Sequence, residues 1–137
     1  MTPETASDTN RTDADLAELA ELVEGILAPW RSLDIAAILE SFEPDGVLQS
    51  MMAPPIRGTD RIGKVLAKHL AHVESIEFEV VNIARNGEVI FVERVDHLLT
   101  KTGTIALPVV GVIHLREGKI REWREYFDQK QSAEPPK

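Results

Sequence analysis

The chain has 137 residues, of which 43% are hydrophobic and 28% are charged, and this is the composition of one folded domain with its own core. The net charge of −8 at pH 7 argues against nucleic acid and against an anionic membrane surface as partners. The chain contains no cysteine, so disulfides and thiolate chemistry are excluded and a cytoplasmic setting is expected. No apolar run approaches the roughly 20 residues that span a bilayer, and the polar N-terminus predicts no signal peptide.

Composition along the chain predicts one domain between two tails. Residues 1–11 are polar and show no period, so we expect a flexible N-terminal tail. Thr12 or Asp13 has the side chain to cap a first helix. The domain is expected over residues 12–130, and residues 131–137 are expected to form a C-terminal tail.

The first half of the domain is predicted to be largely helical. Apolar residues recur at helical spacing over residues 16–27, and Pro29 is expected to end or kink that helix. A short second helix is expected over residues 34–42 with Asp34 as its cap. A third helix is expected over residues 60–72.

The second half alternates with a period of two, which is typical of strands. Strands are expected at residues 47–52, 76–83, 89–99, 105–115 and 119–129. Residues 44–46 and 101–103 predict turns, Asn86-Gly87 predicts a hairpin, and Pro108 with Gly111 predicts a bulge or bend. Helices followed by hairpin-linked strands favour an α+β fold, in which the helices cover one face of a curved sheet and leave one open mouth.

The strand over residues 89–99 carries a charged pair on an apolar row. Arg94 and Asp96 are two residues apart and therefore share a face with Ile90, Val92 and Leu98. Charges without partners are costly to bury, so either this face is exposed or it forms an enclosed pocket that holds the pair for a purpose. The opposite row is also largely apolar, which favours the enclosed pocket.

The last strand repeats this pattern with Trp123, Glu125 and Phe127 on one face. Apolar surroundings disfavour the ionised form of a carboxyl group, and a nearby arginine favours it. Asp96, Glu125 and Arg94 in one dry pocket would therefore allow a general acid and a general base to coexist. A structural ion-pair network between neighbouring strands explains the pattern equally well.

Two further side-chain types are candidates for the pocket wall. His69 lies on the apolar face of the third helix, where it would line the pocket or serve as a structural histidine. His69 and His72 are spaced like a metal pair, but no further ligand stands nearby, so no metal site is expected. Met51 and Met52 would form either an adaptable pocket wall or ordinary core.

Three segments together carry a resemblance to a known family. Residues 93–96 (Glu-Arg-Val-Asp), 118–120 (Gly-Lys-Ile) and 123–128 (Trp-Arg-Glu-Tyr-Phe-Asp) resemble the limonene-1,2-epoxide hydrolase family, as does the Pro-Pro and glycine segment at residues 54–58. The resemblance runs from the first helix to Asp128. It implies a cone-shaped α+β fold of the nuclear-transport-factor-2-like or SnoaL-like type, with a curved, mixed, mostly antiparallel sheet, and often a homodimer.

The resemblance also implies roles for individual residues. Asp96 matches the general acid that protonates the epoxide oxygen, and Arg94 matches the arginine that bridges two carboxyls. Glu125 falls where the family has the aspartate that deprotonates water. Leu48 and Ser50 fall where the family has a tyrosine and an asparagine that hold this water. The implied reaction is a one-step hydrolysis of a small apolar epoxide that uses no cofactor.

Three departures from the family pattern leave other functions open. Glutamate for aspartate moves the carboxylate at position 125 by about 1.5 Å. Leu48 cannot hold water, and Ser50 is shorter than asparagine. The pocket, with Trp123, Phe127, Met52 and His69 as further wall residues, would then serve an isomerase or cyclase acting on a polyketide- or terpenoid-like substrate, or a non-catalytic binding protein.

Overall fold

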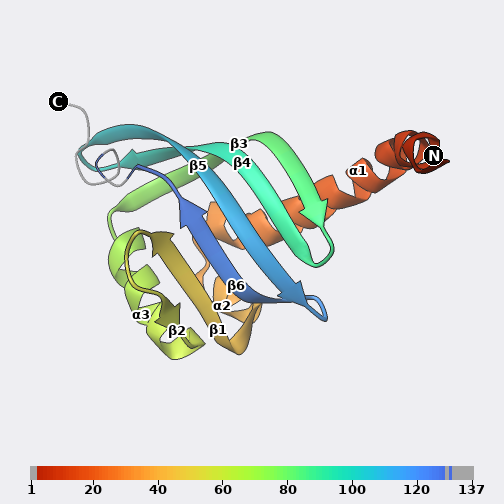
Figure 1. Ribbon diagram of the computed structural model, residues 1–137. Helices are drawn as coiled ribbons and strands as arrows, with labels where there is room; N and C mark the ends of the chain where they lie inside the picture. The colour runs from red at the N-terminus through yellow and green to blue at the C-terminus, as the bar shows by residue number, and fades with distance from the viewer. Residues whose placement is uncertain (1–2, 129, 131–137) are drawn as a thin grey trace.

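The computed structural model describes residues 3–128 and 130, and the side chains from residue 13 onward. Within this part of the chain, six strands form one sheet in the order β2-β1-β6-β5-β4-β3. The strands are β1 (Phe42–Met51), β2 (Ile56–Arg57), β3 (Val73–Asn86), β4 (Val89–Thr100), β5 (Gly103–Arg116) and β6 (Lys119–Tyr126). The helices are α1 (Pro3–Arg31), α2 (Ile35–Glu40) and α3 (Thr59–Leu70). Figure 1 shows the curved sheet in front of α1, with α2 and α3 beside its β1 end.

The predicted α+β class with a mixed, mostly antiparallel sheet is confirmed. Neighbouring strands pair antiparallel throughout, except that β1 and β6 are parallel. Tight turns join β3 to β4, β4 to β5 and β5 to β6, so these strands are neighbours in both sequence and space. The predicted hairpin is present: β3 ends at Asn86, β4 begins at Val89, and Gly87 has the positive φ of 63° that such turns need.

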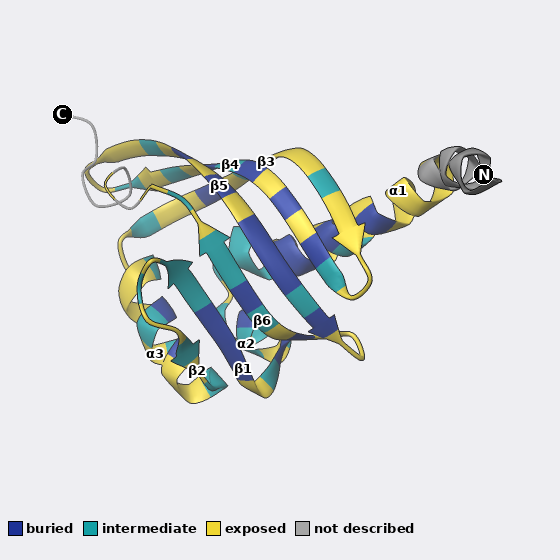
Figure 2. Cartoon of the chain, viewed as in Figure 1, coloured by how far each residue is buried: buried dark blue, intermediate teal, exposed yellow. Residues whose placement is uncertain are grey.

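The core fills the space between the inner face of the sheet and the helices. One stripe of α1 supplies Leu19, Val23, Ile26 and Leu27, each at most 8% exposed. Figure 2 shows a matching alternation of buried and exposed residues along β4 and part of β5, which is the pattern of strands that turn one face to the core. No helix among the described residues is long and apolar enough to cross a membrane.

Several element boundaries differ from the sequence-based expectation. Helix α1 already begins at Pro3 instead of near residue 12, because proline is favoured in the first turn, where its missing N–H costs no hydrogen bond. Residues 44–46 do not turn the chain. They lie inside β1, where the pairing with β6 shifts register between Phe42 and Val47 and so absorbs the extra residues as a bulge.

The strand β5 is more regular than predicted. Its register with β4 runs unbroken through Pro108 and Gly111, so no bulge forms there. Pro108 is tolerated because it lies beyond Val110, the last residue of β5 that pairs with β6. Strand β6 ends at Tyr126 and not at residue 129, which leaves Phe127 outside the sheet.

Candidate active site

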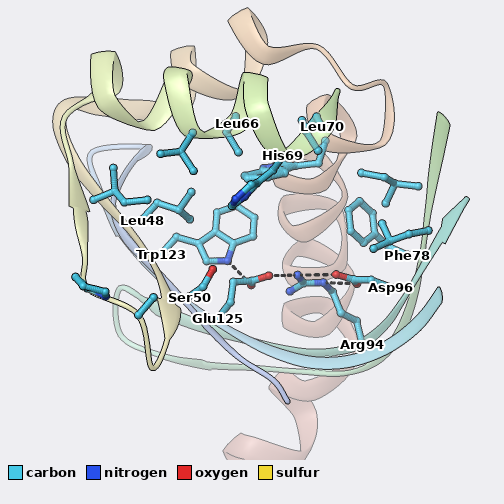
Figure 3. Close-up of a pocket in the computed structure, with 17 residues that line it drawn as sticks. Leu48, Ser50, Leu66, His69, Leu70, Phe78, Arg94, Asp96, Trp123 and Glu125 are labelled. Atoms are coloured by element: carbon cyan, nitrogen blue, oxygen red, sulfur yellow. Dashed lines mark hydrogen bonds and ion pairs between the residues drawn. The ribbon is translucent and has the colours of Figure 1, made fainter. Parts of the chain in front are cut away.

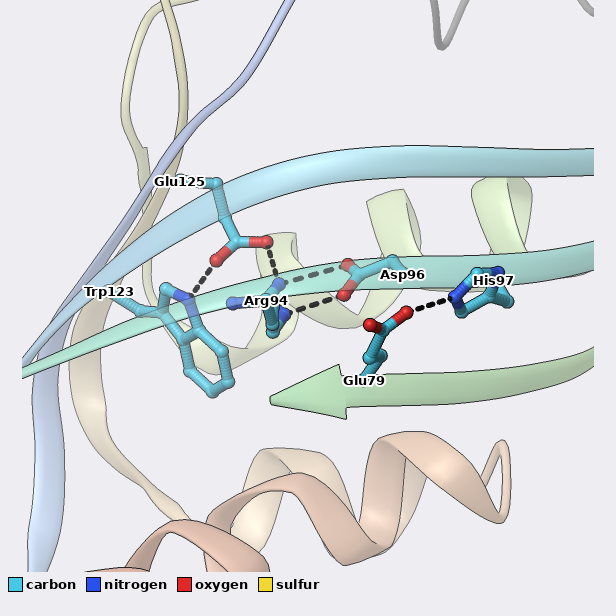
Figure 4. Close-up of polar contacts among 6 residues, drawn as sticks. All are labelled: Glu79, Arg94, Asp96, His97, Trp123 and Glu125. Carbon is cyan, nitrogen blue, oxygen red and sulfur yellow. Dashed lines mark hydrogen bonds and ion pairs between the residues drawn. The ribbon is translucent and has the colours of Figure 1, made fainter. Parts of the chain in front are cut away.

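The structure brings Arg94, Asp96 and Glu125 together on the inner face of the sheet. Arg94 and Asp96 lie on β4 and Glu125 lies on β6, with β5 between them. The Arg94 guanidinium donates from Nε to Asp96 Oδ1 at 2.7 Å and from Nη2 to Asp96 Oδ2 at 3.1 Å. The same Nη2 donates to Glu125 Oε1 at 2.5 Å. Figure 4 shows one arginine joining both carboxyl groups.

The pKa values of Arg94 and Asp96 are both raised, but for different reasons. Arg94 is 3% exposed and Asp96 is 8% exposed. Burial raises the pKa of Asp96 above its usual value, and the Arg94 charge only partly opposes this rise. Burial lowers the pKa of Arg94, but Glu125 and Asp96 reverse this effect and raise it above its ordinary value, so Arg94 remains a cation. The site therefore combines a permanent positive charge with a carboxyl group whose pKa is raised above its ordinary value.

Glu125 is held by a second donor besides Arg94. The indole Nε1 of Trp123, two residues earlier on β6, donates to Glu125 Oε2 at 2.6 Å. Trp123 is 2% exposed and its ring lies 5.2 Å from that of Trp30. Each oxygen of Glu125 thus has a hydrogen-bond donor, while its side chain remains 18% exposed and accessible from the cavity.

These charged groups form one wall of an otherwise largely apolar cavity of about 260 Å³. The cavity lies between the inner face of the sheet and helix α3, as Figure 3 shows. Its lining is completed by Trp30, Leu48, Ser50, Ala53, Pro54, Ile56, Val65, Leu66, His69, Leu70, Ile76, Phe78, Leu98 and Trp123. An apolar pocket with a few convergent polar groups is the usual form of a site for a small molecule. The predicted enclosed pocket is therefore present.

Most of the predicted wall residues line this cavity. Leu48 and Ser50 are on β1, where their register partners on β6 are Trp123 and Glu125. Ser50 is therefore next to the Glu125 carboxylate (Figure 3), and Leu48 is a buried side chain on the same wall. His69 on α3 lies across the cavity from the charged wall and is exposed to solvent.

Two expected wall residues lie elsewhere. Met52 is 88% exposed, because β1 ends at Met51 and the chain then turns, with Ala53 N donating to Ser50 O at 2.6 Å. Phe127 does not line the cavity, because β6 ends before it and the alternation of faces stops there. No group of three metal ligands occurs among the described residues, and His97 binds Glu79 on the outer face.

The structure adds site residues that sequence patterns did not single out. Phe78 on β3 pairs with Asp96 on β4. Two guanidinium groups lie over its ring: the Cζ of Arg94 is 5.5 Å from the ring centroid, and the Cζ of Arg31 on α1 is 5.7 Å from it. Gly111 on β5 lies beneath the junction of the guanidinium and the Glu125 carboxylate. A glycine inside a strand indicates that another group approaches the backbone closely there. The sequence does not identify that group, because this depends on the register between the strands.

The cone-like sheet, its covering helices and the enclosed cavity define a protein of the nuclear-transport-factor-2-like and SnoaL-like class. Within that class, the family model of the limonene-1,2-epoxide hydrolase catalytic domain matches residues 17–133, and the chain belongs to this family. The resemblance seen in the sequence is thereby confirmed.

Individual relatives agree with this assignment. The epoxide hydrolase EphG of Mycobacterium tuberculosis is 27% identical over 77% of this chain and 70% of its own length. A solved M. tuberculosis epoxide hydrolase of the limonene-epoxide-hydrolase-like type has a TM-score of 0.70 and 26% identity over 81% of this chain and 83% of that one. A putative SnoaL-like polyketide cyclase of Shewanella denitrificans has a TM-score of 0.75, but at 17% identity over 83% and 93% of the two chains it shows the fold alone.

Proposed function

We propose that the chain is a cofactor-independent epoxide hydrolase of the limonene-1,2-epoxide type, which adds water to a small apolar epoxide and releases a vicinal diol. The observation that carries the proposal is the arrangement around Arg94. This residue joins Asp96, whose pKa is raised, to a second carboxyl, Glu125, on the wall of an apolar cavity. Two carboxyls in different environments are the usual arrangement of a general acid beside a general base.

The reaction is a single step with no covalent intermediate. Glu125 takes a proton from a water molecule while the water oxygen forms a bond to one epoxide carbon. The bond from that carbon to the epoxide oxygen breaks, and protonated Asp96 gives its proton to this oxygen. Arg94 holds both carboxyls, and its positive charge stabilises the Glu125 carboxylate before it takes the proton and the Asp96 carboxylate after it has given its proton up. Proton exchange with solvent then restores the starting forms of the two acids.

The water in this proposal is held differently from the family pattern. Leu48 offers no polar atom, so the water is bound by the Glu125 carboxylate with the hydroxyl of Ser50 beside it. The extra methylene of Glu125 extends the carboxylate into the cavity and so offsets the shorter side chain at position 50. His69 and Trp123 line the cavity and limit the space that is open to the substrate.

The substrate class follows from the walls. Aliphatic and aromatic side chains dominate the lining, so a small apolar epoxide gains affinity by burial, at about 25 cal/mol per Å² of apolar surface. Its one polar atom, the epoxide oxygen, is oriented toward Asp96.

The test is a turnover assay on a panel of small apolar epoxides in oxygen-18 water. The parent chain should form a diol that carries one labelled oxygen, and Asp96→Asn and Glu125→Gln should each lower the rate by about 100-fold or more. Circular dichroism and thermal melts establish that both variants are folded. Full diol formation by Asp96→Asn would refute the proposed role of the acid.

A second candidate function is favoured by one observation, the apolar Leu48 where a water ligand would stand. If the cavity holds no attacking water, the same acid and base would serve an isomerase or cyclase acting on a polyketide- or terpenoid-like substrate. Its products would carry no oxygen from solvent, which the labelled-water assay distinguishes directly. Ligand binding without turnover, insensitive to Glu125→Gln, would instead indicate a non-catalytic binding protein.

A homodimer is part of the proposal. Phe91, Val110 and Tyr126 lie on the outer face of β4, β5 and β6 and are 38%, 37% and 43% exposed, so a second copy of the chain would bury apolar surface there. Light scattering should report twice the chain mass, and Val110→Lys should shift the mass toward that of one chain. The cytoplasmic location stays a prediction that cell fractionation would test.

A further inference from the structure

Gly111 stands at the point where the charged groups of the site meet. It pairs with Val92 of β4 on one side and with Glu125 of β6 on the other, so it lies on the inner face of the sheet. The Arg94 side chain crosses β5 over this residue to reach Glu125.

A side chain at position 111 would occupy the space of the site itself. A Cβ atom there would stand 2.7 Å from Arg94 Nη1, 2.9 Å from Glu125 Oε2 and 3.3 Å from Trp123 Nε1. Carbon atoms do not approach other heavy atoms this closely without displacement, because ordinary contacts lie near 3.5–4.0 Å. One or more of these three groups would therefore move.

Backbone conformation does not explain the glycine. Gly111 lacks the positive φ that disfavours other residues, whereas Gly87 and Gly118 have it. Its pairing with both neighbouring strands is also regular. The missing side chain is therefore what the position requires.

The neighbours differ in their freedom to move. Arg94 is 3% exposed with its guanidinium over the Phe78 ring, and Trp123 is 2% exposed against Trp30. Glu125 is more accessible, because 18% of its side chain is exposed. A Cβ at position 111 would thus drive the carboxylate toward the cavity, away from the indole N–H.

We propose that Gly111 is a positioning residue, whose missing side chain leaves the space in which Arg94 and the Trp123 indole hold the Glu125 carboxylate. The proposed function does not explain how the site accommodates glutamate at position 125, and the absence of a side chain at Gly111 does. Only the expected effect on turnover rests on the proposed function. The position of the Glu125 carboxylate can be measured independently of turnover.

The readout is the indole N–H signal in a ¹H–¹⁵N spectrum. The chain has two tryptophans, so two indole signals are expected, and Trp30→Phe assigns them. The signal of Trp123 should lie downfield because its N–H donates to a carboxylate at 2.6 Å. In Gly111→Ala this signal should move upfield as the hydrogen bond breaks. The control is Gly25→Ala, where a Cβ meets nothing within 4 Å and both signals should stay in place.

Turnover supplies the second measurement. A displacement of about 1 Å can cost roughly 100-fold in rate, so Gly111→Ala should lower kcat by about that factor, while KM changes little because the apolar walls are unaltered. If the parent chain opens no epoxide, the proposed function fails, and the indole signal still decides the role of Gly111. A Trp123 signal that stays at its parent position in folded Gly111→Ala overturns the inference.

A stability cycle covers a variant that is too unstable for spectra. Gly111→Ala should lower the denaturant midpoint less in a Glu125→Ala background than in the parent, because one of the groups that the new Cβ would meet is gone. Equal losses in the two backgrounds would show that Gly111 does not act through the carboxylate.

Discussion

Arg94 and Asp96 form a doubly hydrogen-bonded pair although they lie two residues apart on one strand. The hydrogen bonds of 2.7 and 3.1 Å hold Asp96, the proposed acid, against Arg94 of the same strand. Glu125, the proposed base, lies on β6. The position of the acid therefore depends on the alternation of a single strand. The position of the base depends on the register across β5.

The first prediction concerns the pH dependence of turnover. Burial raises the pKa of Asp96, and the acid must be protonated to act, so kcat should decline as pH rises through this raised pKa. The measurement is kcat for labelled diol formation across a pH series. His69 is another titratable group on the cavity wall, and in His69→Asn the decline should remain at the same pH. A decline that disappears in this variant would assign it to the histidine instead.

The second prediction concerns the pH dependence of stability. Because the pKa of Asp96 is higher in the folded chain than its ordinary value of 3.8, the folded state binds more protons than the unfolded state between these two values. The contribution of Asp96 to stability is thus fully present below the ordinary pKa and is lost as pH rises through the folded pKa. Urea unfolding at a series of pH values should show this loss in the parent and a smaller loss in Asp96→Asn. Parallel curves for the two proteins would contradict it.

Much of this site follows from strand alternation. The period of two placed Arg94 with Asp96 and Trp123 with Glu125, and the hairpin signal at residues 86–87 made β3 and β4 neighbours. What alternation cannot supply is the register between strands. This register brings Glu125 across β5 to Arg94 and places Gly111 beneath both.

The misplaced wall residues have the same origin. Alternation applies only as long as a strand continues, and both Met52 and Phe127 lie just beyond strand ends. The ends of β1 and β6 are set by which neighbours remain available for pairing, because Tyr126 is the last β6 residue to pair with β1 and β5. That is a property of the assembled sheet and not of the local sequence.

The third prediction concerns the indole donor of Trp123. Trp123→Phe keeps an aromatic ring in the core but removes the N–H that binds Glu125 Oε2. We expect a loss of about 1.5 kcal/mol of stability, at the lower end for a hydrogen bond to a charged group, since water from the cavity can replace the donor. kcat should fall while KM changes little. Chemical denaturation and steady-state kinetics measure both effects.

Trp30→Phe is the matched control for this variant. The Trp30 Nε1 is buried and has no hydrogen-bond partner among the described residues, so its removal breaks no such bond. Its effect on kcat should be clearly smaller than that of Trp123→Phe. If the two variants have equal effects, ring packing and not the hydrogen bond accounts for the role of Trp123.

The fourth prediction concerns variants in which residues 48, 50 and 125 are replaced by the tyrosine, asparagine and aspartate that the family resemblance implies. Glu125→Asp alone withdraws the carboxylate by about 1.5 Å from Arg94 and Trp123 and should lower kcat by roughly 100-fold. Adding Leu48→Tyr and Ser50→Asn places a hydroxyl and an amide beside the shorter acid, because these positions pair with Trp123 and Glu125. The triple variant should recover a large part of the loss, since the water regains ligands.

The double variant Leu48→Tyr/Ser50→Asn, which keeps Glu125, separates this explanation from a general gain of polarity. It should not exceed the parent rate, because the longer carboxylate already extends into the space that the new side chains would share with water. Diol formation in oxygen-18 water measures all four proteins on one scale. Parent activity in Glu125→Asp alone would show that the length of the base is not matched to Leu48 and Ser50, and the proposed water site would then be wrong.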